Sequence, residues 1–167
     1  MNFDWLWPLL VGSALTFGAT TLEGLRSRKH QDRRDAREQL AQALDLATKV
    51  GAEISTAQSK LRFTYEAVDP GSASFTELAA IEAKLPDARV REAVRCVGYV
   101  LNVAQAAQRL DAWDEYAGHV QRGAIGRLRS ILGSAVRGER AFPAADLDWL
   151  NARCREAEVA FRKAYNS

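Results

Sequence analysis

The sequence predicts an all-α protein, with an N-terminal transmembrane helix followed by an antiparallel bundle of about four helices. Three observations support this fold class. The chain opens with an uncharged run, its later apolar residues recur at steps of three and four, and no stretch of useful length alternates apolar and polar residues as a half-buried strand does. Amphipathic helices joined by turns bury their apolar faces against one another in a bundle. We therefore expect a transmembrane anchor at 1–25, a basic juxtamembrane connector at 26–39 and a helical bundle at 40–167.

The opening run contains no charged residue from Trp5 to Leu22. A helix of about 18 residues rising about 1.5 Å each covers about 27 Å, which is just enough for a hydrocarbon core of about 30 Å. Trp5 and Trp7 stand where indole rings prefer the membrane interface. Three Thr, one Ser and two Gly make the run only moderately apolar, so a buried helix of a soluble domain is an alternative. A cleaved signal peptide is a weaker one, because its basic residues would precede the apolar core.

Basic residues cluster in the dozen positions that follow residue 25. They are Arg26, Arg28, Lys29, Arg33, Arg34 and Arg37, whereas Asp4 is the only charged side chain before the run. Because loops on the cytoplasmic side of a membrane carry the excess of Lys and Arg, the N-terminus is expected outside and the bulk of the chain in the cytoplasm. Arginine outnumbers lysine, as in proteins of GC-rich bacteria, so the predicted location is a bacterial inner membrane, single-pass, with lipid as one partner.

Between residues 26 and 68 only one glycine and no proline interrupts the good helix formers. A seam of period 3.5 follows, which is typical of a helix packed along a neighbour as in a coiled coil. Its members are Leu40, Leu44, Ala47, Gly51, Ile54, Gln58, Leu61, Tyr65 and Val68. We expect one long helix here, and its continuity with the preceding span is left open.

Turn and capping signals divide the rest of the chain. A turn at 69–72 precedes a capping box from Ser74 to Glu77, which opens a short helix through Leu85; Pro86 stops it and Asp87 caps the next. Apolar residues cover more than half of the circumference over 88–110, which predicts the most buried helix of the bundle. A glycine-rich helix over 111–138 and, after a break at 140–143, a last helix complete the bundle.

Two candidate contact sites follow from these helices. Arg122, Arg129, Arg137 and Arg140 gather on one side of the wheel over 122–140, opposite an apolar side. Such a helix could lie on the inner leaflet, but an ordinary bundle helix with a solvated arginine face is favoured. Trp149 falls beside the apolar seam of the last helix, so it is a candidate for contact with a partner protein.

No catalytic, cofactor-binding or metal-binding residue is predicted. His30 and His119 lack a nucleophile motif, and no C-x-x-C, H-E-x-x-H, EF-hand or phosphate-loop pattern occurs. The formal charge of +2 is too mild to indicate nucleic acid, and no small-molecule substrate is evident. Cys96 and Cys154 are expected to be buried, inert thiols, with a disulfide as the minor alternative.

The Trp-flanked run, the R-S-R-K-x-x-D-R-R-x-x-R-E-Q stretch from Arg26 and the heptads behind it resemble a loose group of uncharacterised bacterial helical proteins with a single N-terminal anchor. The resemblance covers mainly 5–65 and implies no function. The sequence predicts a non-enzymatic interaction or adaptor protein that binds a protein partner or forms a homo-oligomer. One alternative is a membrane-acting effector of a mobile element, of the phage exclusion or defence type; an enzyme with an unrecognised site is the weakest.

Overall fold

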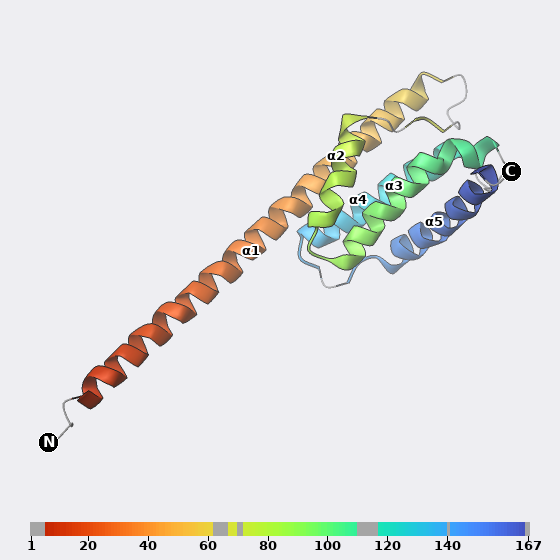
Figure 1. Ribbon diagram of the computed structural model, residues 1–167. Coiled ribbons are helices and arrows are strands. Elements are labelled where there is room, and N and C mark those ends of the chain that lie inside the picture. Colours follow the sequence, from red (N-terminus) through yellow and green to blue (C-terminus); the bar gives the residue numbers. More distant parts are fainter. Residues whose placement is uncertain (1–5, 62–66, 70–71, 110–116, 140, 166–167) are drawn as a thin grey trace. The chain divides into compact units, whose positions relative to one another are not determined.

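The protein is all-α, as the sequence predicts. A computed structural model describes residues 6–61, 67–69, 72–109, 117–139 and 141–165 (Figure 1), and within these ranges it contains no strand. The helices are α1 (Leu6–Ser59), α2 (Ala73–Ile81), the 3₁₀ turn η1 (Glu82–Lys84), α3 (Ala88–Arg109), α4 (Ala117–Val136) and α5 (Ala144–Tyr165).

The chain divides into two units, Met1–Arg37 and Glu38–Ser167. In the first unit, α1 carries the basic stretch predicted as a connector, and nearly all of its side chains from 27 to 37 are exposed. The sequence predicts a transmembrane helix over 1–25. In the part of the chain that the structure describes, no helix combines the length and the apolar character that crossing a membrane requires.

The apolar seam of α1 lies in the core of the second unit. Leu40, Ala47, Ile54 and Gln58 are buried, whereas Leu44, Gly51 and Leu61 are only partly buried. The buried side of the helix also includes Ala43, Leu46 and Val50, which the predicted seam leaves out. The helix ends at Ser59 and not near residue 68, so the predicted length is wrong by about nine residues. Its last turn tightens through bonds from Lys60 N–H to the Ala57 carbonyl (3.2 Å) and from Leu61 N–H to the Gln58 carbonyl (3.1 Å).

The start of α2 also differs from the prediction. Ser72, and not Ser74, caps the helix, because its hydroxyl accepts a hydrogen bond from Phe75 N–H (3.2 Å). The Ser74 hydroxyl instead donates to a Glu53 carboxylate oxygen of α1 (2.8 Å). The predicted capping box is therefore wrong, because the residue three positions after Ser72 is Phe75 and not a Glu or Gln, and Ser74 joins α2 to α1 instead.

Helix α3 is deeply buried, as its wide apolar face predicts, but α4 is buried to a similar extent, so the expectation that α3 exceeds the other helices is not confirmed. Val90, Val97, Val100 and Leu101 show no exposed surface. The helix begins at the predicted cap, where an Asp87 carboxylate oxygen accepts a hydrogen bond from Arg89 N–H (2.7 Å). The three helices α3, α4 and α5 pack against one another and lie side by side in Figure 1.

The end of α4 is fixed by Gly138, whose φ of 74° is a left-handed conformation that side chains with a Cβ rarely adopt. Gly138 N–H bonds to the Ala135 carbonyl and Glu139 N–H to the Ser134 carbonyl, both at 3.0 Å. This pair of bonds is a Schellman motif, which satisfies the last carbonyls of the helix. The chain can then turn back into α5.

Candidate interaction site between α1 and α4

A buried polar network joins α1, α4 and the segment at 67–69. Gln121 of α4 has no exposed surface, and its side-chain amide pairs with the backbone of Val68 in both directions. The Gln121 oxygen accepts from Val68 N–H (2.9 Å), and the Gln121 nitrogen donates to the Val68 carbonyl (2.7 Å). One glutamine thus replaces the neighbouring strand that an extended backbone segment would otherwise need.

Gln58 of α1 extends this network to the arginine face of α4. Its side-chain nitrogen donates to the Gly118 carbonyl at 3.1 Å, and its oxygen accepts a hydrogen bond from the Arg122 guanidinium. Arg122 is one of the arginines that the sequence predicts as a possible partner or lipid contact. Its guanidinium is therefore held toward Gln58 by a charge-assisted hydrogen bond.

A groove of about 180 Å³ lies beside this network, between α1 and α4. Ile54 and Ile125, each 3% exposed, form its floor. Arg122 and Arg129 line it from α4. Gly51, Ser55 and Gly126 complete the lining. Two of the sequence-predicted arginines therefore meet at one apolar groove.

The two glycines of the groove have different reasons to be glycine. A Cβ on Gly51 would lie 2.9 Å from Ile125 Cγ2, so Gly51 is required for the close approach of α1 and α4. A Cβ on Gly126 would meet nothing within 4 Å. Packing within the protein therefore explains Gly51 but not Gly126.

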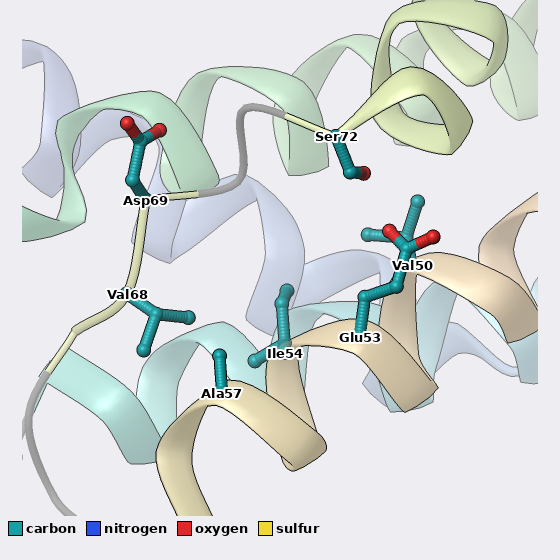
Figure 2. Close-up of a pocket in the computed structure, with 7 residues that line it drawn as sticks. All are labelled: Val50, Glu53, Ile54, Ala57, Val68, Asp69 and Ser72. Carbon is teal, nitrogen blue, oxygen red and sulfur yellow. The ribbon is translucent and has the colours of Figure 1, made fainter. Parts of the chain in front are cut away.

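A second cleft, of about 240 Å³, lies near the start of α2 (Figure 2). Its carboxylates are those of Glu53 and Asp69, and Figure 2 shows Glu53 pointing from α1 toward the segment that carries Ser72. The other lining residues are Val50, Ile54, Ala57 and Val68. Because Glu53 is hydrogen-bonded to Ser74, this cleft has a direct structural use in fixing the start of α2 on α1.

Trp149 is half-buried and not a free aromatic surface. The Arg127 guanidinium carbon lies 4.0 Å from its ring centroid, and that of Arg153 lies 5.4 Å away. The ring also packs against the core and would lie 3.1 Å from a Cβ on Gly123. The cation–π contacts and the space left by Gly123 explain how a tryptophan beside the seam packs within the bundle without a partner protein.

The other predicted contact residues are dispersed. Arg137 lies past the end of α4, where it pairs with Glu139 at 2.6 Å. The hydrogen bond from Arg137, with a further one from Ser134, lowers the pKa of the Glu139 carboxyl. Arg140 and Trp5 lie outside the described residues, as do the side chains of Trp7 and Arg26. The remaining predicted membrane-interface residues, Arg28, Lys29, Arg33 and Arg34, are exposed on α1.

The two cysteines, distant in sequence, meet where α3 packs against α5. Both are free thiols, and Cys96 is 3% exposed. Burial, followed by the hydrogen bond with Cys154, raises the pKa of the Cys96 thiol. Cys96 is therefore protonated at neutral pH and is a poor nucleophile, as predicted for a buried thiol, whereas Cys154 is only partly buried, so its predicted burial is wrong. In the described part of the chain, no three His, Cys, Asp or Glu side chains gather into a group that could hold a metal ion.

Three residues of this site, Gln58, Gln121 and Gly126, are not predicted as contact residues by the sequence. A usable signal existed for Gln58, because a glutamine stands at a core position of an otherwise apolar seam. Gln121 and Gly126 carried no such signal. Their roles depend on which helix lies beside α4, and a single helix does not encode its neighbour.

Comparison of the chain with protein-family models, with curated proteins and with solved structures finds no match. The resemblance to anchored bacterial helical proteins therefore stays a prediction, and function is argued from the geometry of the site alone.

Proposed function

We propose that this protein acts by binding and not by catalysis: it is a helical interaction protein whose unit Glu38–Ser167 recognises a partner protein through the groove between α1 and α4. The single observation behind the proposal is that two arginines, Arg122 and Arg129, flank an apolar floor on an open groove. Arginine beside an apolar surface is a combination enriched at protein–protein contacts.

The apolar face of α4 is not available for this purpose. Val120, Leu128 and Ile131 have no exposed surface, and they pack into the core of the bundle. Recognition is thus assigned to the arginine side of the helix. A solvated arginine face carries charge and donors that an acidic partner can use.

We further propose that residues 1–25 hold the chain at the bacterial inner membrane, with the following basic stretch at the cytoplasmic leaflet. The support is the order of the sequence, an uncharged tryptophan-flanked run followed by a block of Arg and Lys. Each basic residue near an anionic leaflet contributes on the order of 1 kcal/mol to membrane affinity.

The test is a pull-down from detergent-solubilised membranes, with identification of the captured proteins. A partner specific to the groove should be captured by the wild-type chain and lost with the Arg122→Glu/Arg129→Glu variant. Arg155→Glu is the matched control, because Arg155 is exposed on α5 and does not line the groove. Equal capture by all three proteins, or crosslinking that shows only a monomer without a partner, contradicts the proposal.

A further inference from the structure

We infer that the groove between α1 and α4 takes an acidic amphipathic helix of the partner protein, with two carboxylates two helical turns apart and an aliphatic side chain between them. This inference rests on the proposed function and specifies the chemistry of the partner. It follows from the separation of the two arginines, the apolar floor between them and the bare surface at Gly126.

The relative direction of α1 and α4 sets the axis of the groove. Gln58 bonds to Gly118 at one end, whereas Gly51 approaches Ile125 further along α4. Residue numbers thus fall on α1 as they rise on α4, and the two helices run antiparallel. A groove between antiparallel helices offers a straight path for a third helix.

The arginines mark two points on this path and not one. Arg122 and Arg129 are seven residues apart, which places them on the same face of α4 and about 10 Å apart along its axis. The hydrogen bond to Gln58 holds the Arg122 guanidinium at its own end of the groove. Within the described residues, Arg129 is exposed and makes no hydrogen bond or ion pair. Two separated cations favour two separated carboxylates over a single phosphate headgroup.

A partner helix presents that spacing when acids stand at positions i and i+7. A leucine at i+3 then lies between them and faces Ile54 and Ile125, which form the floor of the groove. A guanidinium has five N–H donors, so Arg122 can bind Gln58 and a carboxylate together.

Gly126 supplies the independent argument. Glycine in a helix interior is unfavourable relative to alanine, and here no neighbouring atom of the protein excludes a Cβ. Gly126 is exposed at the groove, where its bare backbone lets a partner helix approach closely. Gly98 of α3 also has open space around it but lies outside the groove, so it serves as a matched control.

The experiment measures binding of a fluorescein-labelled helical peptide with Glu at i and i+7 and Leu at i+3 to the full chain in mild detergent. Gly126→Ala and Gly98→Ala should each raise Tm by about 2–4 °C. Only Gly126→Ala should lower the affinity for the peptide, by about fivefold or more. Arg122→Gln/Arg129→Gln should weaken it at least tenfold, and a peptide with Lys in place of both Glu should not bind.

Equal peptide binding by the two alanine variants overturns the inference, as does binding of the Lys peptide. Binding of phosphatidylglycerol vesicles that depends on the same arginines, without peptide binding, assigns the groove to lipid and also overturns it. A partner protein captured through Arg122 and Arg129 while this peptide fails to bind leaves the proposed function standing and removes only the acidic-helix inference. If neither partner capture nor peptide binding depends on Arg122 and Arg129, the proposed function and the acidic-helix inference are both overturned.

Discussion

At the scale of single residues, two buried glutamines do what apolar side chains cannot. Gln58 and Gln121 are 1% and 0% exposed, and their amides satisfy the backbone of Val68 and the carbonyl of Gly118. An apolar residue at Gln121 would leave the buried N–H and carbonyl of Val68 without their partner, at a cost of about 1–3 kcal/mol each, and one at Gln58 would remove an acceptor from the Arg122 guanidinium. Specific hydrogen bonds of this kind also fix which turn of α1 faces which turn of α4.

Replacement of Gln121 tests this role. Gln121→Leu should lower the free energy of unfolding by about 2–3 kcal/mol, because Val68 N–H and the Val68 carbonyl both lose their partner. Urea denaturation measures the change. Gln42→Leu, at an exposed position of α1, should change stability by less than about 0.5 kcal/mol. Equal effects of the two substitutions would show that the network contributes nothing specific.

At the scale of helices, caps and close approaches decide where each element begins and how near its neighbour lies. Asp87 starts α3, and Gly138 ends α4. Both signals are local in the sequence. The approach of α1 to α4 at Gly51 is different, because it depends on Ile125, which is 74 residues away in the chain.

The cap at Asp87 makes the stability of α3 depend on pH. Partial burial alone would raise the pKa of Asp87, but hydrogen bonds and the charge of Arg89 outweigh it, so the pKa lies below its usual value. A lowered folded-state pKa means that the stabilisation is present above the unfolded pKa of about 4 and is lost as pH falls through the folded value.

Asp87→Ala should therefore cost about 1 kcal/mol at pH 7, the typical loss for an N-cap, and progressively less below about pH 4. Thermal unfolding monitored by circular dichroism across pH 2–7 checks this prediction, with the pH range set by the ordinary Asp value. Asn102→Ala, at an exposed position of α3, is the control and should show no such trend. A constant cost of Asp87→Ala at every pH would contradict the assignment.

Gly51→Ala tests the close approach of α1 and α4. The new Cβ would lie 2.9 Å from Ile125 Cγ2, which is stiff because isoleucine is β-branched. Overpacking of this kind costs about 1–3 kcal/mol and should outweigh the better helix propensity of alanine, which is about 1 kcal/mol.

A second variant, Ile125→Leu, tests whether the loss comes from the contact between residues 51 and 125. Ile125→Leu moves the branch away from Cβ, so the double variant should recover part of the loss in a double-mutant cycle. If Gly51→Ala alone stabilises the protein, the close approach of α1 and α4 does not require a glycine at this position.

At the scale of the whole molecule, the chain separates into Met1–Arg37 and Glu38–Ser167, and only the second unit holds the described core and both clefts. Binding is accordingly proposed for the second unit and location for the first. The two assignments can fail independently of each other.

Deletion of residues 1–25 tests the location. The full chain should sediment with bacterial membranes and resist an alkaline carbonate wash, whereas the shortened chain should stay in the supernatant, because the uncharged run is the proposed anchor. The full-length Arg122→Gln/Arg129→Gln variant, which keeps residues 1–25, should remain in the membrane fraction. A full chain found in the supernatant would remove the membrane proposal and leave the groove unaffected.

The sequence by itself determined the all-α class, the burial of α3, the Asp87 cap and the apolar seam of α1, because periodicity and capping are written in residues within a few turns of each other. It could not determine that α1 ends at Ser59, that Ser72 caps α2, or that Trp149 lies between two arginines. Only the tertiary structure decided these points and assembled Arg122, Arg129 and Gly126 at one groove. The physical reason is that hydrogen-bond partners and free space belong to pairs of helices, and the identity of a helix's neighbour is not encoded in its own pattern.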